Sequence, residues 1–439
     1  LASDNFTLTN GALLLENSGA NVSQILDLDG SNSSSLMVVL SSDNQATWNI
    51  NGGVLSADLL AVNGGTLYTS NSQLKVDKVQ VTANTSMQIT GTSIENFSQF
   101  FVANGATWVD DASSSFFINE AEIEATFEAP AIAFKAPLQV DNGKLTVIAT
   151  DAQIQELRMG QSSVVIANPL SINDLSINAG SEFKIQNGSI VAVEELDLQA
   201  TAGSMIKMIG TSEGPNAVLQ VNPQKKFCFD YLDLLDLDLG GNASISIGEN
   251  SQQTNSSNWF VGACEDLLFA NFNVQFACTN GITFFEDLSE GNVSEQTWYV
   301  DGQEIAKGAN AEYFFPLPGT YEIALEITDG LDNFTSLTQT IEVVESEIEP
   351  NSIIQNPTQL ASLKVGDSYQ WYKNYEPVPG ETGRVYLYQG EAAVYFVLTF
   401  VDGCNRISEV LDLLGTAVEN LDENPNPDIR IYPNPVEDI

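Results

Sequence analysis

The sequence predicts an all-β protein in which a parallel, right-handed β-helix is followed by two small β-sandwiches. Three observations lead to this fold class. An apolar-x-apolar pattern recurs about every 20 residues between Leu60 and Ile247. From Val274 onward, short strand-like segments alternate with turns about every 8–12 residues, as in a sandwich. The chain contains no run of about 18 apolar residues, so we expect no membrane insertion.

Two columns of apolar residues define the repeat, and the second column lies two residues after the first. Successive side chains of a strand alternate between its faces, so each pair points into one core. One such unit cannot bury its apolar face alone, whereas stacked units share a continuous core. An ordinary β-sandwich with coincidental spacing is the alternative. The first column consists of Leu60, Val79, Phe100, Ala121, Leu138, Leu157, Leu175, Leu196, Leu219 and Leu237.

The predicted solenoid covers residues 1–265 and ends in a cap. A polar run, residues 249–258, precedes the neighbouring aromatic residues Trp259 and Phe260. A bare end coil would expose apolar surface and unpaired backbone groups. We therefore expect this aromatic pair to cover the last coil.

The four cysteines are expected to serve structure rather than metal binding. They lack CxxC spacing, and the chain has no histidine, so a zinc site is not expected. Cys228 and Cys264 flank the last coil, and we predict a disulfide between them in an oxidising compartment. Cys278 and Cys404 would have to bridge two domains, and their pairing stays open.

Residues 266–345 are predicted to form the first sandwich. A strand-like segment ends in Asp287-Leu288-Ser289, Trp298 lies in the next segment, and Pro318–Tyr321 and Thr338–Val343 follow. These features resemble the PKD family, whose members share the Asp-x-Ser strand end, the tryptophan, the Pro-Gly-Thr-Tyr turn and the final strand. The turn after Trp298 departs from the usual family sequence. The resemblance implies a β-sandwich with Trp298 in its core.

Residues 346–414 are predicted to form the second sandwich, after the acidic linker Glu345–Pro350. The segment Tyr369–Asn374 contains Trp371, and an apolar strand and a Asp-Gly-Cys turn at Cys404 follow. This pattern resembles the immunoglobulin-like modules of secreted Bacteroidota proteins, which implies that Trp371 is the core tryptophan. Such modules often carry a partner cysteine in their first strand. None is present here, so Cys404 has no partner within its module.

The C-terminal residues are predicted to carry an export signal. Residues 415–428 are a polar, proline- and asparagine-rich linker. Residues 429–439 resemble the opening strand of the type A C-terminal sorting domain of the type IX secretion system. The resemblance implies an extracellular or cell-surface protein that binds the type IX translocon, an outer-membrane shuttle protein and the sortase. The residues that carry it are Tyr432, Pro433, Asn434, Pro435 and Val436.

The sorting domain is expected to continue beyond Ile439. Leu1 is not a start methionine and no signal peptide precedes it, so we expect Leu1 to be a fragment edge or a processed end.

The charge of the chain argues against two classes of partner. The net charge is −43, from 58 acidic and 15 basic residues. Such a chain repels phosphate backbones and anionic lipid headgroups. We therefore expect no nucleic-acid partner and no binding to an anionic membrane surface.

An enzyme is not predicted, although many β-helices degrade polysaccharides. Among the outward positions, only Glu122, Gln139 and Arg158 approach a catalytic cluster, and we interpret them instead as a polar ladder across coils. Arg158 is the only arginine of the predicted solenoid, and a lyase needs a basic residue. The outward column contains no threonine ladder, aromatic row or repeated aspartate. It consists of Ala61, Gln80, Phe101, Glu122, Gln139, Arg158, Ser176, Asp197, Gln220 and Asp238.

No cofactor is predicted, with calcium as the alternative. The stretch Asp27–Asn32 and the three residues Asp233, Asp236 and Asp238 offer oxygen ligands that calcium prefers. Alternation along a strand would separate the three aspartates. We interpret both stretches as solvated loops.

Together these features favour a non-catalytic secreted or cell-surface protein, an adhesin or a component of a surface appendage. Its expected partners are surface glycans or other surface proteins. One alternative is a glycan-binding or polysaccharide-degrading β-helix protein, and another is secretion cargo of unassigned activity. Glycan binding that localises to residues 1–265 would favour the first alternative over the adhesin.

Overall fold

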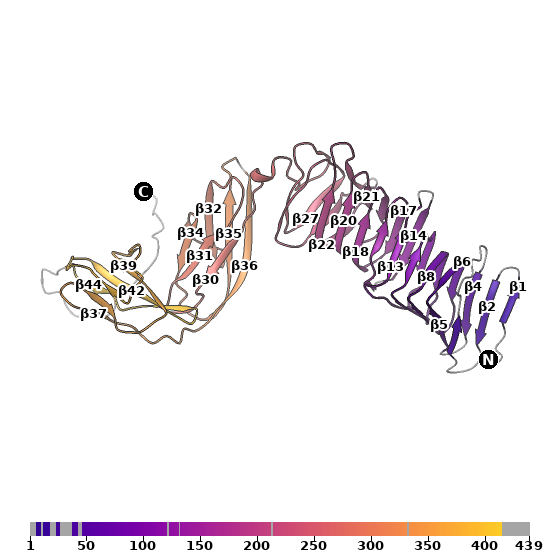
Figure 1. The fold of residues 1–439 in the computed structure, drawn as a ribbon. Helices are drawn as coiled ribbons and strands as arrows, with labels where there is room; N and C mark the ends of the chain where they lie inside the picture. Colours follow the sequence, from indigo (N-terminus) through magenta and orange to yellow (C-terminus); the bar gives the residue numbers. More distant parts are fainter. Residues whose placement is uncertain are drawn as a thin grey trace. The chain divides into compact units, whose positions relative to one another are not determined.

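The computed structural model describes residues 6–9, 12–17, 23–26, 37–42, 46–120, 123–130, 132–211, 214–331 and 333–414. It confirms the predicted fold class: a parallel β-solenoid of about 10 turns is followed by small antiparallel sheets (Figure 1). The chain divides into two compact units, Leu1–Cys264 and Glu265–Ile439. A single 3₁₀ turn among the described residues, η1 (Cys264–Asp266), lies at their boundary.

Each coil of the solenoid adds one short strand to each of three parallel faces. In one coil these are β10 (Ser93–Glu95) on the first face, β11 (Gln99–Val102) on the second and β12 (Thr107–Val109) on the third. Each strand pairs in parallel with its counterpart in a neighbouring coil, as β10 does with β8 and β13. The three faces enclose one apolar core because alternate side chains of every strand point inward.

The remaining short strands of the solenoid can be assigned to the three faces. Five long strands each cross two faces. The first face also contains β13 (Ser115–Ile118), β16 (Leu138–Val140), β25 (Lys226–Cys228) and β28 (Ser244–Ser246). The second face also contains β2 (Ala12–Asn17), β4 (Met37–Ser42), β14 (Glu124–Ala129), β17 (Lys144–Ala149), β19 (Ser163–Ile166), β21 (Glu182–Ile185), β23 (Ile206–Gly210), β26 (Leu232–Leu235) and β29 (Gln252–Thr254). The third face also contains β3 (Ser23–Leu26), β5 (Thr47–Asn51), β7 (Thr66–Ser70), β9 (Ser86–Thr90), β15 (Ala133–Phe134), β24 (Ala217–Val221) and β27 (Leu237–Gly241). At the N-terminal end, β1 (Phe6–Thr9) pairs antiparallel with β2.

Each long strand passes from one face into the next without a turn between them. The corner at which this happens changes along the solenoid. In the early coils, β6 (Val54–Val62) and β8 (Gln73–Val81) run from the first face into the second. In the later coils, β18 (Gln153–Met159), β20 (Leu170–Asn178) and β22 (Ile190–Gln199) run from the third face into the first. The fold therefore keeps three faces while the tight turns move from one corner to another.

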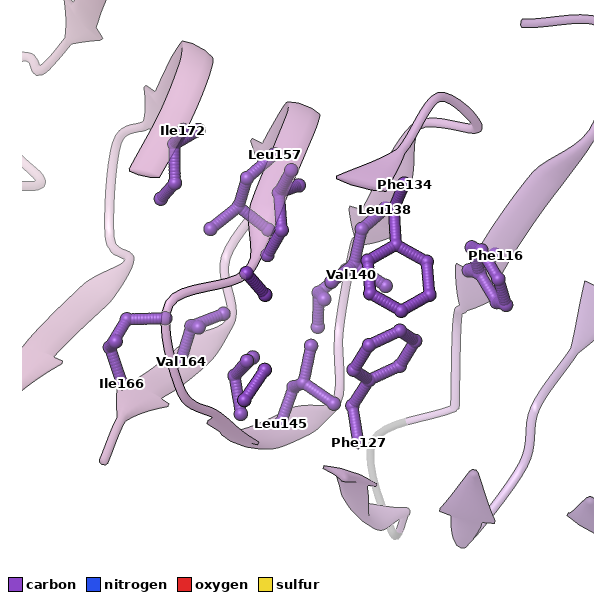
Figure 2. Packing of buried hydrophobic residues seen from close by; sticks show 14 of the residues in the cluster. Phe116, Phe127, Phe134, Leu138, Val140, Leu145, Leu157, Val164, Ile166 and Ile172 are labelled. Carbon is purple, nitrogen blue, oxygen red and sulfur yellow. The ribbon is translucent and has the colours of Figure 1, made fainter. Parts of the chain in front are cut away.

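An aromatic cluster fills the core where this change occurs. Phe116, Phe127 and Phe134 come from the three faces of one coil and point toward one another (Figure 2). The ring centroids of Phe116 and Phe127 lie 5.4 Å apart, and those of Phe127 and Phe134 lie 4.9 Å apart, both edge-to-face. Aliphatic residues such as Leu138 and Leu145 continue the core in the next coil (Figure 2). Edge-to-face pairs are favourable for aromatic side chains, so these rings stabilise the core at this point.

The predicted first column is correct within separate runs. Leu60, Val79 and Phe100 pair in register on the second face. A second run pairs in register on the first face: Leu138, Leu157, Leu175 and Leu196.

The column is wrong where it joins these runs. Phe100 continues to Phe127 and not to Ala121, which lies outside the described residues. Leu219 lies on the third face, opposite Val191 and Leu239, so it does not follow Leu196. The reason is that all three faces show the same apolar alternation. A shift from one face to the next is therefore invisible in the periodicity.

The cap forms as predicted. Trp259 is 5% exposed, belongs to the solenoid core and donates from Nε1 to the carbonyl of Leu237 at 2.9 Å. The amide of Phe260 donates to Ile245, and the Phe260 carbonyl accepts from the amide of Ile247. These bonds supply partners to backbone groups of the last coil that would otherwise face solvent.

The first sandwich packs two antiparallel sheets around Trp298. Its indole is fully buried and donates from Nε1 to the Gly308 carbonyl at 2.9 Å. One sheet has the order β30 (Phe272–Gln275), β31 (Thr283–Asp287) and β34 (Asn310–Tyr313). The other has the order β33 (Gln303–Lys307), β32 (Glu295–Val300), β35 (Gly319–Thr328) and β36 (Phe334–Val343).

The second sandwich has Trp371 in its core, as predicted. Trp371 is fully buried, stacks on Tyr386 at 5.7 Å and donates to the Gly383 carbonyl. One sheet contains β37 (Ile353–Gln355), β38 (Leu360–Ser362) and β41 (Val385–Tyr386). The other contains β40 (Glu376–Pro377), β39 (Ser368–Lys373), β42 (Val394–Val401), β43 (Cys404–Ile407) and β44 (Leu411–Asp412).

The two sandwiches contact each other through a small apolar core. Phe396 and Leu398 of β42 cluster with Ile282, which comes from the first sandwich. The rings of Phe276 and Phe400 lie 4.9 Å apart across the same contact. Strand β42 is therefore buried on both faces, which accounts for its continuous apolar sequence.

The expected acidic linker packs against both sandwiches. Ser346 is buried, and its amide donates to Thr279 Oγ1 in the first sandwich at 3.1 Å. The Ile348 carbonyl accepts a bond from Arg406 Nη1 of the second sandwich. The segment thus joins the contact between the sandwiches.

Candidate functional site

The outward side chains of the solenoid form ladders on each of its three faces. The predicted single outward column divides among them. Ala61, Gln80 and Phe101 are neighbours on the second face, and the next member is Glu128. The expected member Glu122 lies outside the described residues.

The first face carries the longest part of the predicted column. It continues in register through Gln139, Arg158, Ser176 and Asp197. Arg158 Nε donates to Glu156 Oε1 of its own strand at 2.5 Å, and Gln139 donates to Asp141 at 2.8 Å. These groups are occupied within their own coils, so the ladder resembles a solvated polar face more than a pair of reactive carboxylates.

The other two members of the predicted column lie on the third face. Gln220 stands between Ala192 and Gly240, and Asp238 stands opposite Val218. They therefore form no ladder with Asp197, which lies on the first face.

A column of hydroxyl side chains on the third face was missed by the sequence analysis, which found no threonine ladder. Thr47, Thr66, Ser86 and Thr107 follow one another in register on β5, β7, β9 and β12. The neighbouring outward column is mixed and contains Tyr68. In the sequence, a Thr or Ser stands directly before the first inward residue of each of these strands. The column can be recognised only after the strands have been assigned to faces.

Two shallow depressions lie on the early coils. The first, with a volume of about 320 Å³, is acidic around Lys75 and is lined by Asp58, Asp77, Glu95 and Glu120. Within it, Asn96 donates to Glu120 at 2.9 Å. This depression is a polar, mostly acidic groove.

The second depression has a different chemical character. It has a similar volume of about 320 Å³ and lies on the second face. The half-buried ring of Phe101 borders the amides of Gln80 and Gln99, with Lys78 and Glu128 at its sides. An aromatic face beside amide and charged groups is suited to a sugar ring, which offers C–H bonds to the aromatic ring and hydroxyls to the polar groups.

The predicted disulfide Cys228–Cys264 is present, with Cα atoms 5.6 Å apart. Cys228 ends β25 on the first face, and Cys264 follows the cap. The bond closes a loop of 36 residues around the last coil. Cys278 and Cys404, which the sequence left open, also form a disulfide.

The candidate calcium ligands near the end of the solenoid are tied to amides. Asn255 Nδ2 donates to Asp236 at 2.6 Å, and Asp238 accepts from Asn216 and from the amide of Ser257. Burial opposes ionisation of Asp238, but the bonds from Asn216 and Ser257 outweigh it and lower the pKa of the carboxyl. These aspartates stabilise the cap region by hydrogen bonding.

The described part of the chain contains no cluster of potential metal ligands. There, no group of three or more Asp, Glu, His or Cys side chains is arranged to hold a metal ion. The other candidate stretch, Asp27–Asn32, lies outside the described residues.

The sorting-signal residues Tyr432, Pro433, Asn434, Pro435 and Val436 also lie outside the described residues.

Two sequence features that suggested the first sandwich, the Asp-x-Ser strand end and the Pro-Gly-Thr-Tyr turn, lie within the described residues. Ser289 donates from its amide to Asp287 Oδ1 at 2.8 Å, and Tyr321 donates from its hydroxyl to the Leu317 carbonyl at 3.0 Å. Both hydrogen bonds lie next to strand ends. Among the described residues, no helix is long and apolar enough to cross a membrane.

Comparisons with known proteins give little similarity. The sequence matches no protein-family profile, and no curated protein matches it. Fibronectin(III)-like modules of Clostridium thermocellum CbhA are 9% identical, with a TM-score of 0.17, over 33% of this chain and 90% of that chain. The insect immune protein hemolin is 12% identical, with a TM-score of 0.14, over 40% of this chain and 50% of that chain.

Proposed function

We propose that this chain is a non-catalytic protein exported by a type IX secretion system and displayed at the cell surface or released, as an adhesin or part of a surface appendage. The observation that carries the proposal is that all four cysteines are joined in disulfides. Disulfides form and persist in oxidising environments outside the cytosol. Cys228–Cys264 holds the end of the solenoid together, and Cys278–Cys404 holds the two sandwiches together.

The arrangement of modules supports a role in display. The solenoid is a stack of coils with a covered end, and the two sandwiches are joined to each other, so each unit is suited to presenting a surface. PKD-like and immunoglobulin-like identities for the two sandwiches, with Trp298 and Trp371 as their core tryptophans, belong to this proposal. The outward polar groups of the first face are occupied by intracoil partners such as Glu156 and Asp141, which favours a surface that binds over one that catalyses.

Export is tested by removing residues 429–439, which contain the proposed sorting motif. We expect the truncated protein to stay folded in the periplasm, because the motif that the translocon, shuttle protein and sortase would bind is gone. A matched control removes residues 415–428 instead and keeps the motif. Surface labelling and cell fractionation report the outcome. Normal surface delivery of the first variant would exclude the motif as the export signal.

Adhesion is tested separately in a deletion strain. Loss of surface attachment, restored by the full chain but not by a chain that lacks residues 1–264, would support an adhesive solenoid. Restoration by the shorter chain would place adhesion in the sandwiches. Unchanged attachment of the deletion strain would contradict the adhesin proposal and leave the chain as cargo of another activity.

A second candidate function, glycan binding, is favoured by the depression around Phe101. If sugars bind there, Phe101→Ala should weaken binding about tenfold, the loss expected for one aromatic contact. Phe117 is a matched control, because it also faces outward and is half-buried, but lies on the first face between Glu95 and Gln139. A glycan array compares the two variants. Equal loss in both, or no binding by the unmodified protein, would reject this site.

A further inference from the structure

The disulfide Cys278–Cys404 joins the beginning of the paired sandwiches to their end. Cys278 follows β30, the first strand of the unit, and Cys404 begins β43, near its last. Their sequence separation of 126 residues encloses nearly all of both sandwiches, including the core residues Trp298 and Trp371. Only short segments, residues 265–277 and 405–414, of the described unit lie outside this covalent ring.

Noncovalent contacts hold the two cysteines in place. Asn405 is fully buried, accepts from the amide of Ile282 at 2.8 Å and donates to the Ile282 carbonyl at 2.6 Å. The backbones approach so closely that a Cβ on Gly281 would lie 2.2 Å from the Asn405 carbonyl oxygen. The Phe276–Phe400 ring contact flanks the same point. The Cα atoms of the cysteines are thus kept 5.7 Å apart, within the usual range for a disulfide.

This position has a mechanical consequence. Tension applied to the two ends of a chain follows its covalent path, and a disulfide offers a path that skips the residues it encloses. Pulling therefore loads residues 265–278, crosses the sulfur–sulfur bond and continues from Cys404. The residues inside the ring carry no tension, and they include most of both sandwich cores, whereas Phe276 and Asn405, which contact the other sandwich, lie outside it.

We propose that Cys278–Cys404 is a force bypass, which keeps both sandwiches folded when the protein is pulled between its solenoid and its C-terminal side. Cys228–Cys264 does the same for the last coil and the cap, over 36 residues. The biological use of this device rests on the proposed function, since a surface protein held through its C-terminal side is the one that bears such a load. The device itself is a property of the folded chain.

Single-molecule pulling of residues 1–439 by handles at both ends tests the bypass. The oxidised protein should not release the enclosed sandwich residues at any force that leaves the sulfur–sulfur bond intact. After a reductant is added to the folded protein, unfolding should release about 580 Å more chain: about 450 Å from the 126 residues of the sandwich ring and about 130 Å from the 36 residues closed by Cys228–Cys264, at about 3.6 Å per residue. Solenoid unfolding appears in both conditions and serves as the internal reference.

Two variants separate the bonds. Cys278→Ser/Cys404→Ser should show the long step of about 450 Å without reductant, whereas Cys228→Ser/Cys264→Ser should add only about 130 Å. Circular dichroism before pulling confirms that each variant is folded, and the reduced unmodified protein replaces any variant that is not.

Two outcomes would overturn the bypass. One is a long step in the oxidised protein. The other is a reduced protein whose sandwiches stay closed at forces that unfold the solenoid, because the noncovalent contacts would then be sufficient. Because pulling uses purified protein, a failure here is distinct from a failure of export or adhesion.

Discussion

The solenoid and the paired sandwiches hold their strands together over very different lengths of chain. In the solenoid, a strand pairs with the strand one coil away, as Leu157 does with Leu175. In the paired sandwiches, the contacts that join the two modules link residues 123 to 126 positions apart. Coil contacts repeat, so stability is spread over many similar pairs. The joined sandwiches depend on a few contacts whose loop-closure cost is high.

This contrast teaches where each region is vulnerable. A solenoid is weakest at its ends, where the repeating partner is missing, and the disulfide Cys228–Cys264 is placed there. The sandwiches are weakest where they meet, and Cys278–Cys404 is placed there. The following predictions test whether changes in one region leave the other unaffected.

The largest effect is expected from an inward change in the solenoid. Leu175 is 1% exposed and packs between Leu157 and Leu196. Leu175→Asn should reduce the stability of the solenoid by about 5 kcal/mol, through lost apolar contact and a buried amide without partners. Urea denaturation with hydrogen exchange resolved by peptide should show this loss within residues 37–264 alone.

Its neighbour provides the control. Ser176 faces outward, and Ser176→Asn should change stability by less than about 0.5 kcal/mol. Equal losses for the two variants would contradict the assignment of inward and outward positions on the first face.

A slightly smaller effect is expected at the end of the solenoid. Removing the disulfide with Cys228→Ser/Cys264→Ser should cost about 4 kcal/mol, the chain-entropy contribution of a 36-residue loop. Exchange should rise first in the cap and the last coil, and unfolding should then spread toward earlier coils. If protection were lost equally in every coil, the solenoid would be one cooperative block and the contrast with the sandwiches would fail.

A third variant tests the contact between the sandwiches. Asn405→Ala should reduce the stability of residues 265–414 by about 3 kcal/mol, because the Ile282 amide and carbonyl lose their bonds while remaining buried. Denaturation of the solenoid should not change. Asn273→Ala is the control, since Asn273 is exposed on β30 in the same unit. A loss as large for Asn273→Ala would show that the contact has no special weight.

The smallest effects should appear as pH dependence at two adjacent aspartates of the solenoid. Burial raises the pKa of Asp110 above its ordinary value of 3.8, and the bonds from the Ala136 and Lys135 amides offset this only in part. In Asp111, hydrogen bonds from Ser114 and other donors outweigh burial and lower the pKa.

The signs are therefore opposite. With its pKa raised in the folded state, Asp110 disfavours folding as pH rises above 3.8, and Asp110→Asn should remove that decline. Asp111 contributes stability above its ordinary pKa that is lost as pH falls, so Asp111→Asn should destabilise at pH 7. Each change should stay below about 1 kcal/mol between pH 4 and pH 7. Unfolding curves at several pH values measure both, and shifts of the same sign would contradict the assignment.

Local chemistry along the chain was enough to predict much of this molecule. Alternating apolar residues with turns about every 20 positions predicted a parallel solenoid, because one strand's inward face can be read from its own residues. Trp259, Trp298 and Trp371 were correctly placed as cap and core residues, since large aromatic side chains must be covered somewhere nearby. The pairing of Cys228 with Cys264 followed from their positions around one coil.

Only the tertiary structure decided how these elements are arranged. Every face of the solenoid shows the same alternation, so the sequence did not reveal that Leu196 and Leu219 lie on different faces, or that hydroxyl residues form a column on the third. The joining of Cys278 to Cys404 was equally hidden, because it depends on a contact between two modules. The apolar residues of β42 pack into the core of their own sandwich on one face and against the neighbouring sandwich on the other. A sequence specifies that such a strand must be buried on both sides, but the folded chain determines which surface covers it.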